Sequence, residues 1–373
     1  MNAVATQIVP VALGDRSYEI HVGAGLLEQA GSLMAPHLPG KRAIIVTDTN
    51  VAVRYAKKLT EALEASGIRV ERVVVNPGEA SKSFASFESV MEQILALQPD
   101  RKTALVALGG GVVGDLTGFA ASTLLRGVPF LQVPTSLLAQ VDSSVGGKTA
   151  INTRAGKNLV GSFYQPQLVL ADLDTLKTLP PREMRAGYAE IIKYGLIADA
   201  DFYQWCLAHA AALLEGDVAT LQQAVVKSCQ MKAAIVAEDE READRRALLN
   251  FGHTFGHALE AETGFSDTLL HGEAVAMGMV MACALSSALG PLPATVEAEL
   301  AAHFKTLGMK AQLAEVPAPW QADQIARHFA SDKKAESGTL TFVVLDAIGK
   351  GRVAKQVDAA HARAVVVNAG AAA

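Results

Sequence analysis

The sequence contains few cysteines and few aromatic residues. Only three of its 373 residues are cysteine, and they lie far apart without forming a CxxC pair: Cys206, Cys229 and Cys283. This spacing argues against a disulfide framework, so we expect buried thiols in a reducing compartment. The N-terminus also lacks a basic segment followed by an apolar core, the pattern of a secretory signal. We therefore expect a cytoplasmic protein.

An excess of basic charge is also missing. The chain carries 33 Lys and Arg against 38 Asp and Glu, a formal net charge of −5. Nucleic acid and anionic membranes both favour a basic surface, so we expect neither as the main partner. The apolar run Ala274–Gly290 is interrupted by Gly278, Ser286 and Ser287 and falls just short of membrane-spanning length. We expect a buried helix there.

Length and pattern predict two domains. Cores rarely grow beyond about 250–300 residues, and this chain has 373, half of them hydrophobic. Residues 1–180 alternate short apolar runs with helical periodicity, which predicts a largely parallel sheet covered by helices. Residues 181–373 have mostly helical spacing up to about Ala330. Two β-like stretches near the C-terminus predict a hairpin, and the final Ala/Gly tail is expected to fray.

The predicted elements have the following bounds. A β-hairpin is expected over Gln7–His21, around the turn dipeptide Gly14-Asp15. The strands of the first domain are expected at Ala43–Thr47, Val70–Val75, Ala104–Leu108, Phe130–Val133 and Leu168–Leu170. Helices are expected at Val51–Ala65, Phe84–Leu97 and Arg182–Leu196, and the terminal hairpin at Thr339–Asp346 and Gly351–Val357.

A glycine turn after one predicted strand is typical of dinucleotide binding. Gly109, Gly111 and Gly114 form a GxGxxG pattern between a predicted strand and a helical stretch. Glycines let the backbone approach a pyrophosphate, and the helix N-terminus supplies free N–H groups. Glycine also serves ordinary tight turns, so this motif alone leaves both interpretations open.

Two other loops strengthen the nucleotide hypothesis. Asp48-Thr49-Asn50 follows the strand before it, where the carboxylate can accept hydrogen bonds from ribose hydroxyls or can cap the next helix. Pro77-Gly78-Glu79-Ala80-Ser81-Lys82 combines a glycine turn with a carboxylate and an ammonium group. By itself, this second segment is also compatible with an ordinary loop and cap.

A group of histidines indicates a metal site. His253 and His257 are four residues apart and therefore lie on one face of a helix. The Glu of an HExxH motif is missing, which disfavours a metalloprotease. His271 and Glu273 begin a later helical run, and an earlier predicted helix carries Glu190. Three or four nitrogen and oxygen ligands from facing helices suit zinc, although spacing does not decide which of these side chains bind it.

Cationic residues near glycines indicate an anion-binding region. The stretch Thr135–Asn158 contains Asp142, Lys148, Asn152, Lys157 and Asn158, with Gly146-Gly147 just before Lys148. In an acidic protein, lysines beside glycines favour an anion cradle. Further cations stand at Lys193, Lys232 and Arg246, each of which alone is typical of a solvated surface.

Taken together, these motifs resemble the 3-dehydroquinate synthase family. The segments that carry the resemblance are Pro77–Lys82, Gly109–Asp115, Thr135–Lys148 and Leu249–His257, of which Thr135–Lys148 is the most specific. The match runs from the first hairpin to Asp332-Lys333-Lys334. It implies an N-terminal Rossmann-like NAD-binding α/β domain, a mostly α-helical C-terminal metal-binding domain, and a homodimer.

The resemblance also implies a reaction. Members of the family convert 3-deoxy-D-arabino-heptulosonate 7-phosphate, a sugar-acid phosphate, to 3-dehydroquinate and phosphate in the shikimate pathway. NAD oxidises a ring carbinol, phosphate leaves by β-elimination while acting as its own base, and the returned hydride precedes ring opening and aldol closure. The enzyme is then a phosphate-eliminating lyase that regenerates NAD in each turnover.

Site residues follow by resemblance. Glu190, His253 and His271 correspond to the zinc ligands, with Co²⁺ as an alternative metal, whereas His257 faces the substrate. The implied substrate contacts are Asp142, Lys148, Asn158, Lys193, Lys232, Arg246, Asn250, His257 and Lys334 (or its neighbour Lys333), together with Arg126 from the partner subunit. The implied cofactor contacts are Asp48, Asn50, Pro77, Gly78, Glu79, Lys82, Gly111, Val112, Val113, Gly114, Asp115, Thr135, Ser136, Lys148, Lys157, Thr175, Leu176, Lys177 and Thr178.

Three alternatives remain at this point. A related cyclase forming 2-deoxy-scyllo-inosose or a valiolone would share the motifs but take a different sugar phosphate. A metal-dependent polyol dehydrogenase of the glycerol dehydrogenase type would share the two-domain layout and accumulate NADH. A sugar-phosphate-binding protein without activity would release no phosphate.

Overall fold

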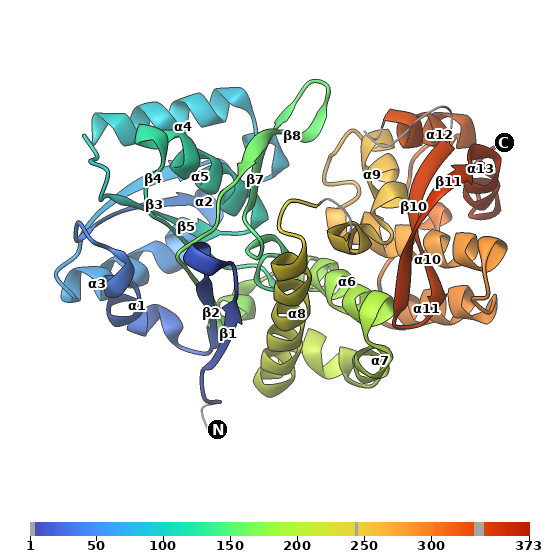
Figure 1. Cartoon of the computed structure of the whole chain (residues 1–373), viewed down its shortest axis with the longest axis horizontal. Coiled ribbons are helices and arrows are strands. Elements are labelled where there is room, and N and C mark those ends of the chain that lie inside the picture. Colours follow the sequence, from blue (N-terminus) through green and yellow to red (C-terminus); the bar gives the residue numbers. More distant parts are fainter. Residues whose placement is uncertain (1–3, 243–244, 332–338) are drawn as a thin grey trace. The chain divides into compact units, whose positions relative to one another are not determined.

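The computed structural model describes residues 4–242, 245–331 and 339–373 (Figure 1). The chain forms two compact units, one of residues 1–180 and 216–241 and the other of residues 181–215 and 242–373. The predicted domain boundary at 180/181 is the point where the chain first passes from the first unit into the second. Helix α8 (Val218–Glu238), however, belongs to the first unit and not to the second. It packs against β1 (Gln7–Val11) and β2 (Tyr18–Gly23), where Gln222 Nε2 donates to the carbonyl oxygen of Val22 at 3.0 Å.

A seven-stranded sheet of order β1-β2-β9-β6-β5-β3-β4 forms the centre of the first unit. Its other strands are β3 (Arg42–Asp48), β4 (Arg69–Val75), β5 (Ala104–Gly109), β6 (Phe130–Pro134) and β9 (Leu168–Asp172). Strands β1 and β2 pair antiparallel, and every other neighbouring pair is parallel. The predicted N-terminal hairpin, the five predicted strands and the largely parallel sheet are therefore confirmed.

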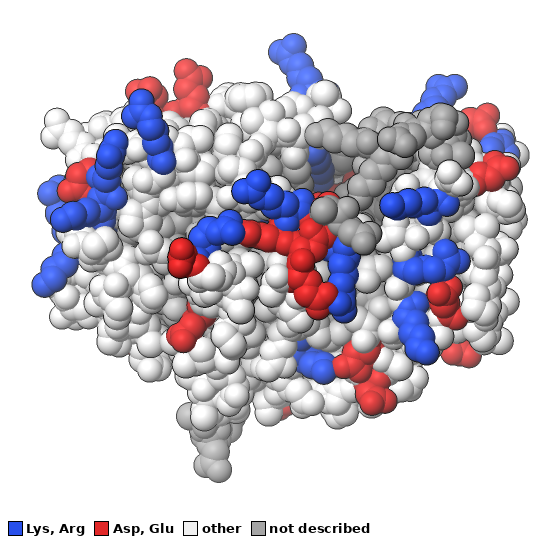
Figure 2. Space-filling model, viewed as in Figure 1, with Lys and Arg blue, Asp and Glu red and all other residues white. Residues whose placement is uncertain are grey.

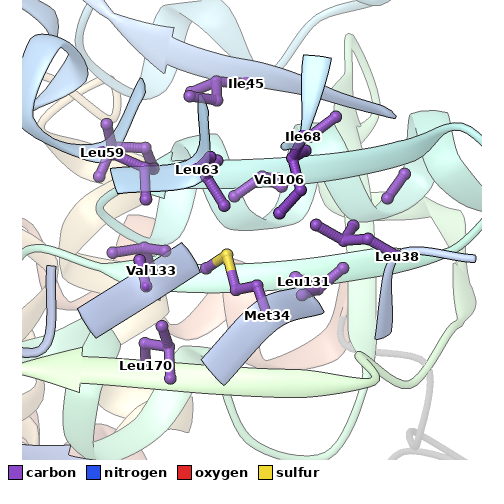
Figure 3. Close-up of a cluster of buried hydrophobic side chains, with 14 of the residues drawn as sticks. Met34, Leu38, Ile45, Leu59, Leu63, Ile68, Val106, Leu131, Val133 and Leu170 are labelled. Carbon is purple, nitrogen blue, oxygen red and sulfur yellow. The ribbon is translucent and has the colours of Figure 1, made fainter. Parts of the chain in front are cut away.

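Helices cover both faces of this sheet, which explains why its strands are continuously apolar. Ile45 and Val106 point toward α1 (Leu26–Met34) and α3 (Lys57–Ala65), in the cluster that Figure 3 shows with Met34 and Leu63. Their neighbours Ile44 and Leu105 point the other way, toward α4 (Phe84–Ala96) and α5 (Gly111–Thr123). Successive side chains thus alternate between two buried layers.

Two segments of the first unit differ from the predicted pattern. The helix predicted over Val51–Ala65 is divided into α2 (Thr49–Val51), a π-helical turn (Ala52–Ala56) and α3. Residues Lys148–Thr153 and Gly156–Phe163 form an antiparallel hairpin, β7–β8, that was not predicted. No residue of strand β8 is fully buried, so it lacks the apolar run by which the other strands are recognised.

The second unit is mostly helical, as predicted. Its helices are α6 (Pro181–Ala198), α7 (Ala200–Leu214), α9 (His253–Glu262), α10 (His271–Leu289), α11 (Thr295–Thr306), α12 (Ala322–Ser331) and α13 (Ala359–Asn368). Strands β10 (Thr339–Ala347) and β11 (Lys350–Asp358) form the predicted terminal hairpin. The C-terminal tail does not fray, contrary to expectation. Val366 in α13 is buried, and Ala372 accepts a hydrogen bond from the amide of Ala322 at 2.8 Å.

Helix α10 is the core helix of this unit. It packs against α6, α9, α11, α13 and β10. It is the one helix among the described residues that is long and apolar enough to cross a membrane, but 78% of its most apolar window is buried within the protein. The prediction of a buried helix is therefore confirmed.

The distribution of surface charge and the burial of the cysteines agree with what the composition predicted. On the face that Figure 2 shows, acidic and basic side chains are interspersed among uncharged residues. All three cysteines are free and buried, as expected. Burial raises the pKa of the Cys229 thiol to about 12, so it stays protonated at neutral pH.

Close packing of α10 on α9 generates a stability prediction. A Cβ atom on Gly278 would overlap the carbonyl oxygen of Gly252, the residue that precedes α9. We expect Gly278→Ala to lower the free energy of unfolding by about 1–3 kcal/mol, the usual cost of overpacking. Urea denaturation measures this, with Ala288→Ser on the exposed side of the same helix as control. Equal stability of both variants would contradict the prediction.

Candidate functional site

Three side chains from three helices of the second unit meet around one buried oxygen atom. Glu190 lies in α6, while His253 and His271 are the first residues of α9 and α10. The Nε2 atoms of His253 and His271 lie 3.5 and 3.7 Å from Glu190 Oε1. The candidate ligand atoms of the three residues all lie within 4.8 Å of one another. The residues that the resemblance implied as metal ligands are thus brought together.

The hydrogen bonding of Glu190 fits a bound cation. Its side chain is 1% exposed, and Oε2 pairs with Lys193 one turn along α6. Oε1 is buried without a hydrogen-bond partner among the described residues. A buried carboxylate oxygen without a donor is costly, and a metal ion between it and the two imidazoles removes that cost.

Both histidines present the same nitrogen to this carboxylate. His253 Nδ1 lies 3.2 Å from the carbonyl oxygen of Phe251, which only a protonated Nδ1 can bond. His271 Nδ1 lies 3.1 Å from Glu260 Oε2. Each contact places the proton on Nδ1 and leaves the Nε2 lone pair toward Glu190. One oxygen and two imidazole nitrogens form a donor set that suits zinc or cobalt.

Electrostatics keep His253 in the form that binds metal. Burial lowers its pKa well below the ordinary value, and the Lys193 cation and the other two imidazoles lower it further. A neutral imidazole is the metal-binding form. His253 therefore does not need to lose a proton at neutral pH before it binds a cation.

The other two candidate ligands, His257 and Glu273, are not members of this group of three. His257 is exposed one turn after His253, and its ring centroid lies 5.9 Å from that of His271. Glu273 instead accepts hydrogen bonds from Arg182 Nε at 2.8 Å and from the amide of Leu270 at 3.0 Å. Although burial opposes this, those donors and Lys310 hold the pKa of Glu273 below its usual value. Glu273 thus caps α10 and fixes where His271 stands.

In the first unit, the implied cofactor residues follow the carboxyl ends of the parallel strands. Asp48 ends β3 opposite Val75 of β4, and Gly109 ends β5 opposite Pro134 of β6. The loops after these strands, and after β9, carry most of the residues implied as cofactor contacts, whereas Lys148 and Lys157 lie in hairpin β7–β8. Ligands of open parallel sheets bind at this edge, so the placement agrees with a nucleotide site.

The glycine turn leads directly into a helix, as the motif requires. Helix α5 begins at Gly111, and Gly110 precedes it without a side-chain cap. A Cβ atom on Gly111 would lie 2.9 Å from Ser143 Oγ, and one on Gly114 would lie 2.9 Å from Gln132 Oε1. The first amides of α5, those of Gly111, Val112 and Val113, therefore stand at a helix N-terminus where side chains leave no room for larger residues.

Asp48 caps a helix, the alternative that the sequence left open. Its Oδ1 accepts hydrogen bonds from the amides of Asn50 at 2.8 Å and Val51 at 3.1 Å. Across the same edge, Thr175 Oγ1 donates to the carbonyl oxygen of Asp172, and Lys177 pairs with Asp174 at 2.6 Å. These bonds fix the loops that carry the implied cofactor contacts.

A polar cluster joins the start of α5 to hairpin β7–β8. Lys82 is buried, and its Nζ lies 2.6 Å from Asp115 Oδ2 and 2.5 Å from Asn158 Oδ1. Burial raises the pKa of Asp115, and the Lys82 cation opposes that shift. Glu79 Oε1 accepts from Asn152 Nδ2 at 2.8 Å and lies 3.9 Å from Lys157 Nζ. Four implied cofactor residues and one implied substrate contact therefore share one network.

The remaining implied substrate contacts fall into smaller groups. In the first unit, the buried Lys232 lies 3.0 Å from Asp142 Oδ1, whereas Lys148 begins β7 with an exposed side chain. In the second unit, Arg246 is 1% exposed, and Asn250 Nδ2 donates to Glu242 Oε1 at 2.8 Å. Lys333 and Lys334 lie outside the described residues.

Two residues that contact the implied metal ligands or cofactor residues were not predicted from the sequence. Glu260 contacts His271. Helical spacing could have indicated this residue, because it lies seven residues after His253 and three after His257, on the same face of α9. Tyr55 Oη donates to the carbonyl oxygen of Thr175 at 3.0 Å and lies 2.5 Å from Thr178 Oγ1. Tyr55 comes from the π-helical turn, which no sequence pattern indicated.

Comparison with known proteins identifies close relatives over the whole chain. Residues 72–186 match the family model described as 3-dehydroquinate synthase N-terminal, and residues 187–335 match 3-dehydroquinate synthase C-terminal. The 3-dehydroquinate synthase of Caulobacter vibrioides is 53% identical over 97% of this chain and 99% of its own length. That of Rhodospirillum rubrum is 52% identical, over 98% and 95%.

Solved structures of related cyclases share the fold. A 2-deoxy-scyllo-inosose synthase, complexed with carbaglucose-6-phosphate, NAD⁺ and Co²⁺, superimposes with a TM-score of 0.86 at 27% identity, covering 97% of this chain and 99% of its own. A 2-epi-5-epi-valiolone synthase from Streptomyces hygroscopicus, with NAD⁺ and Zn²⁺ bound, gives 0.85 at 26% identity, covering 96% and 98%. A glycerol dehydrogenase from Schizosaccharomyces pombe gives 0.67 at 16% identity, covering 93% and 87%, which shows the fold alone. The matched domains and the full-length relatives together place this chain in the 3-dehydroquinate synthase family.

Proposed function

We propose that the chain converts 3-deoxy-D-arabino-heptulosonate 7-phosphate to 3-dehydroquinate and phosphate, as a lyase that depends on NAD and a divalent metal. The observation that carries this proposal is the buried Glu190 Oε1, which has no hydrogen-bond partner among the described residues and faces two imidazole Nε2 atoms. Relatives more than 50% identical over nearly the whole chain support the choice among the cyclases.

Glu190, His253 and His271 would hold the metal, which is zinc or cobalt. With only three protein ligands, such a centre leaves positions for substrate hydroxyls and supplies Lewis-acid polarisation of their oxygens. Lys193 pairs with Glu190 and offsets part of the charge that this carboxylate brings into the core. His257, which is exposed beside the three ligands, is then available to contact substrate.

The carboxyl edge of the parallel sheet would hold NAD, which supplies a hydride acceptor and then a hydride donor. The helix N-terminus at Gly111 offers amides to the pyrophosphate, while the Asp48 loop and residues 175–178 flank the same strand ends. The Lys82, Asp115 and Asn158 cluster orders the β7–β8 hairpin beside them. These residues bind and orient, and none needs to accept a proton.

The cations implied by the family would bind the anionic substrate. Lys232 is held rigidly by Asp142, and Arg246 is fixed by burial, so neither loses much side-chain entropy when a carboxylate or phosphate approaches. Lys148 and Asn250 would add charge and hydrogen bonds at its oxygens. Because the departing phosphate serves as base, these side chains need only bind and orient the sugar acid.

The proposal also includes a homodimer in the cytoplasm. The backbone turn at Arg126 supports the dimer. Leu125 and Arg126 have φ angles of 49° and 69°, which residues other than glycine rarely adopt, and backbone strain of this kind persists where function requires it. Leu125 is 36% exposed and Phe163 44%. Tyr164, next to Phe163, donates to the carbonyl oxygen of Val128 at 2.7 Å, which ties the chain after Phe163 to the residue that follows the turn. Arg126 would thus reach a partner's substrate phosphate.

The activity can be tested by phosphate release from the heptulosonate phosphate. We expect stoichiometric phosphate and 3-dehydroquinate without accumulation of NADH, because the hydride returns to the substrate in each turnover. A chelator should abolish release, and zinc or cobalt should restore it. Steady NADH formation would contradict the cyclase, and faster turnover of a heptulose phosphate without a carboxylate would favour a related cyclase.

The division of the histidines predicts two classes of variant. His271→Ala and Glu190→Gln should lose bound zinc, because each removes one of the three ligands. His257→Ala should retain zinc and lose rate by about 10²-fold, the scale of removing one preorganised hydrogen-bond donor from a reacting centre. Metal analysis beside the phosphate assay measures both. If His257→Ala lost zinc while His271→Ala and Glu190→Gln retained it, this assignment of the metal ligands would be rejected.

The role of Arg126 predicts complementation between inactive subunits. In a mixed dimer of Arg126→Ala and His257→Ala chains, one of the two sites receives both native residues. Random pairing makes half of the dimers mixed, so the coexpressed chains should recover about a quarter of the wild-type rate. Coexpression with two affinity tags isolates the mixed dimer. If it is as inactive as its parents, Arg126 acts within its own subunit.

A further inference from the structure

We propose that Glu260 is a positioning residue that fixes the orientation and proton of the metal ligand His271. This inference rests on the proposed metal centre and concerns a residue that neither the sequence motifs nor the family resemblance assigned. Glu260 lies in α9, and its side chain is 2% exposed. Its Oε2 atom lies 3.1 Å from His271 Nδ1, the ring nitrogen that faces away from Glu190.

The chemistry of imidazole makes this contact decisive. A neutral ring carries one proton on either nitrogen, and only the nitrogen without it can bind a metal. A carboxylate at Nδ1 holds the proton there, leaves the Nε2 lone pair directed at the position beside Glu190 Oε1, and makes Nε2 a stronger donor. Glu260 therefore selects the tautomer that the metal site needs.

His271 depends on such a partner more than His253 does. The side chain of His253 is 12% exposed, and the backbone carbonyl of Phe251 receives its Nδ1 proton. His271 stands at the start of α10 with a side chain that is 35% exposed, so packing restrains its ring less. A buried, helix-borne carboxylate supplies the orientation that packing does not.

Burial of the Glu260 carboxylate also argues for a specific use. Placing an ionised carboxylate at 2% exposure costs free energy, and an apolar residue or an amide would avoid much of that cost. The negative charge is most useful where it faces an imidazole that donates electrons to a cation.

A second metal ion is the competing explanation. His257, Glu260 and His271 also bring their ligand atoms within 4.8 Å of one another. For both groups to bind metal at once, His271 would have to use Nε2 for one ion and Nδ1 for the other, and its ring would have to lose both protons. The two explanations predict different metal stoichiometries.

Glu262 provides a matched control on the same helix. It is also a partly buried carboxylate, 14% exposed, and its Oε1 lies 2.7 Å from His328 Nε2. His328 belongs to α12 and is not a candidate ligand. Removing Glu262 therefore removes a carboxylate–imidazole contact of α9 without touching the metal centre.

The test compares zinc affinity and stoichiometry in wild type, Glu260→Gln, Glu260→Ala and Glu262→Ala, measured on the full-length apoprotein by competition with a chromophoric chelator. We expect one zinc per chain throughout, with affinity about 10–100-fold lower in Glu260→Ala and a smaller loss in Glu260→Gln, which keeps the shape and an acceptor oxygen. Glu262→Ala should stay within twofold of wild type. The visible spectrum of the Co²⁺-loaded protein should change for both Glu260 variants and not for Glu262→Ala.

Each contrary outcome has a distinct meaning. Wild-type affinity and an unchanged cobalt spectrum in both Glu260 variants would overturn the positioning role while leaving the metal centre intact. A stoichiometry that falls from two to one in Glu260→Ala would overturn it in favour of a second ion. Failure of the wild-type apoprotein to bind zinc would overturn the metal centre itself and the inference with it. Because Glu260→Gln is isosteric, a folding defect confined to Glu260→Ala leaves the comparison decisive.

Discussion

The second unit depends on one electrostatic constraint, a carboxylate in an apolar core with an oxygen that no hydrogen-bond donor among the described residues reaches. Glu190 is 1% exposed, and Lys193 neutralises only its other oxygen. A cation held between this oxygen and two imidazoles satisfies an anion that would otherwise destabilise the fold. Metal binding should therefore contribute to the stability of the unit as well as to the chemistry.

The helix ends and the helix crossings both help to bring the three candidate metal ligands together. Both histidine ligands are the first residues of their helices, where the partial positive charge of the helix end disfavours protonated imidazole. The helices can approach closely because glycines lie at their crossings: Gly272 faces the backbone of Ala186 in α6, and Gly278 faces Gly252 before α9. A side chain at either position would push apart the helices that bring the ligands together.

Sequence patterns predicted the parts of the molecule that are dictated locally. Strands buried on both faces, the two hairpins and the helix bearing His253 and His257 each follow from short-range periodicity, and the structure confirms them. Tertiary contacts decided the rest. Helix α8 has ordinary helical spacing, and only its packing on β1 and β2 assigns it to the first unit. Glu273 had the spacing of a ligand, but Arg182 and the amide of Leu270 engage it instead.

The cofactor edge and the metal group do not by themselves determine which reaction this fold catalyses. A glycerol dehydrogenase shares the architecture at a TM-score of 0.67 and 16% identity, so neither the sheet edge nor the helical unit by itself specifies a cyclase. The difference must lie in side chains that hold an anionic, phosphate-bearing substrate through an elimination. In this chain those candidates are fixed before substrate arrives, Lys232 by Asp142 and Arg246 by burial. Cations that are already held in place would lose little side-chain entropy on binding a charged substrate, so these residues are where a difference between the two kinds of enzyme is best sought.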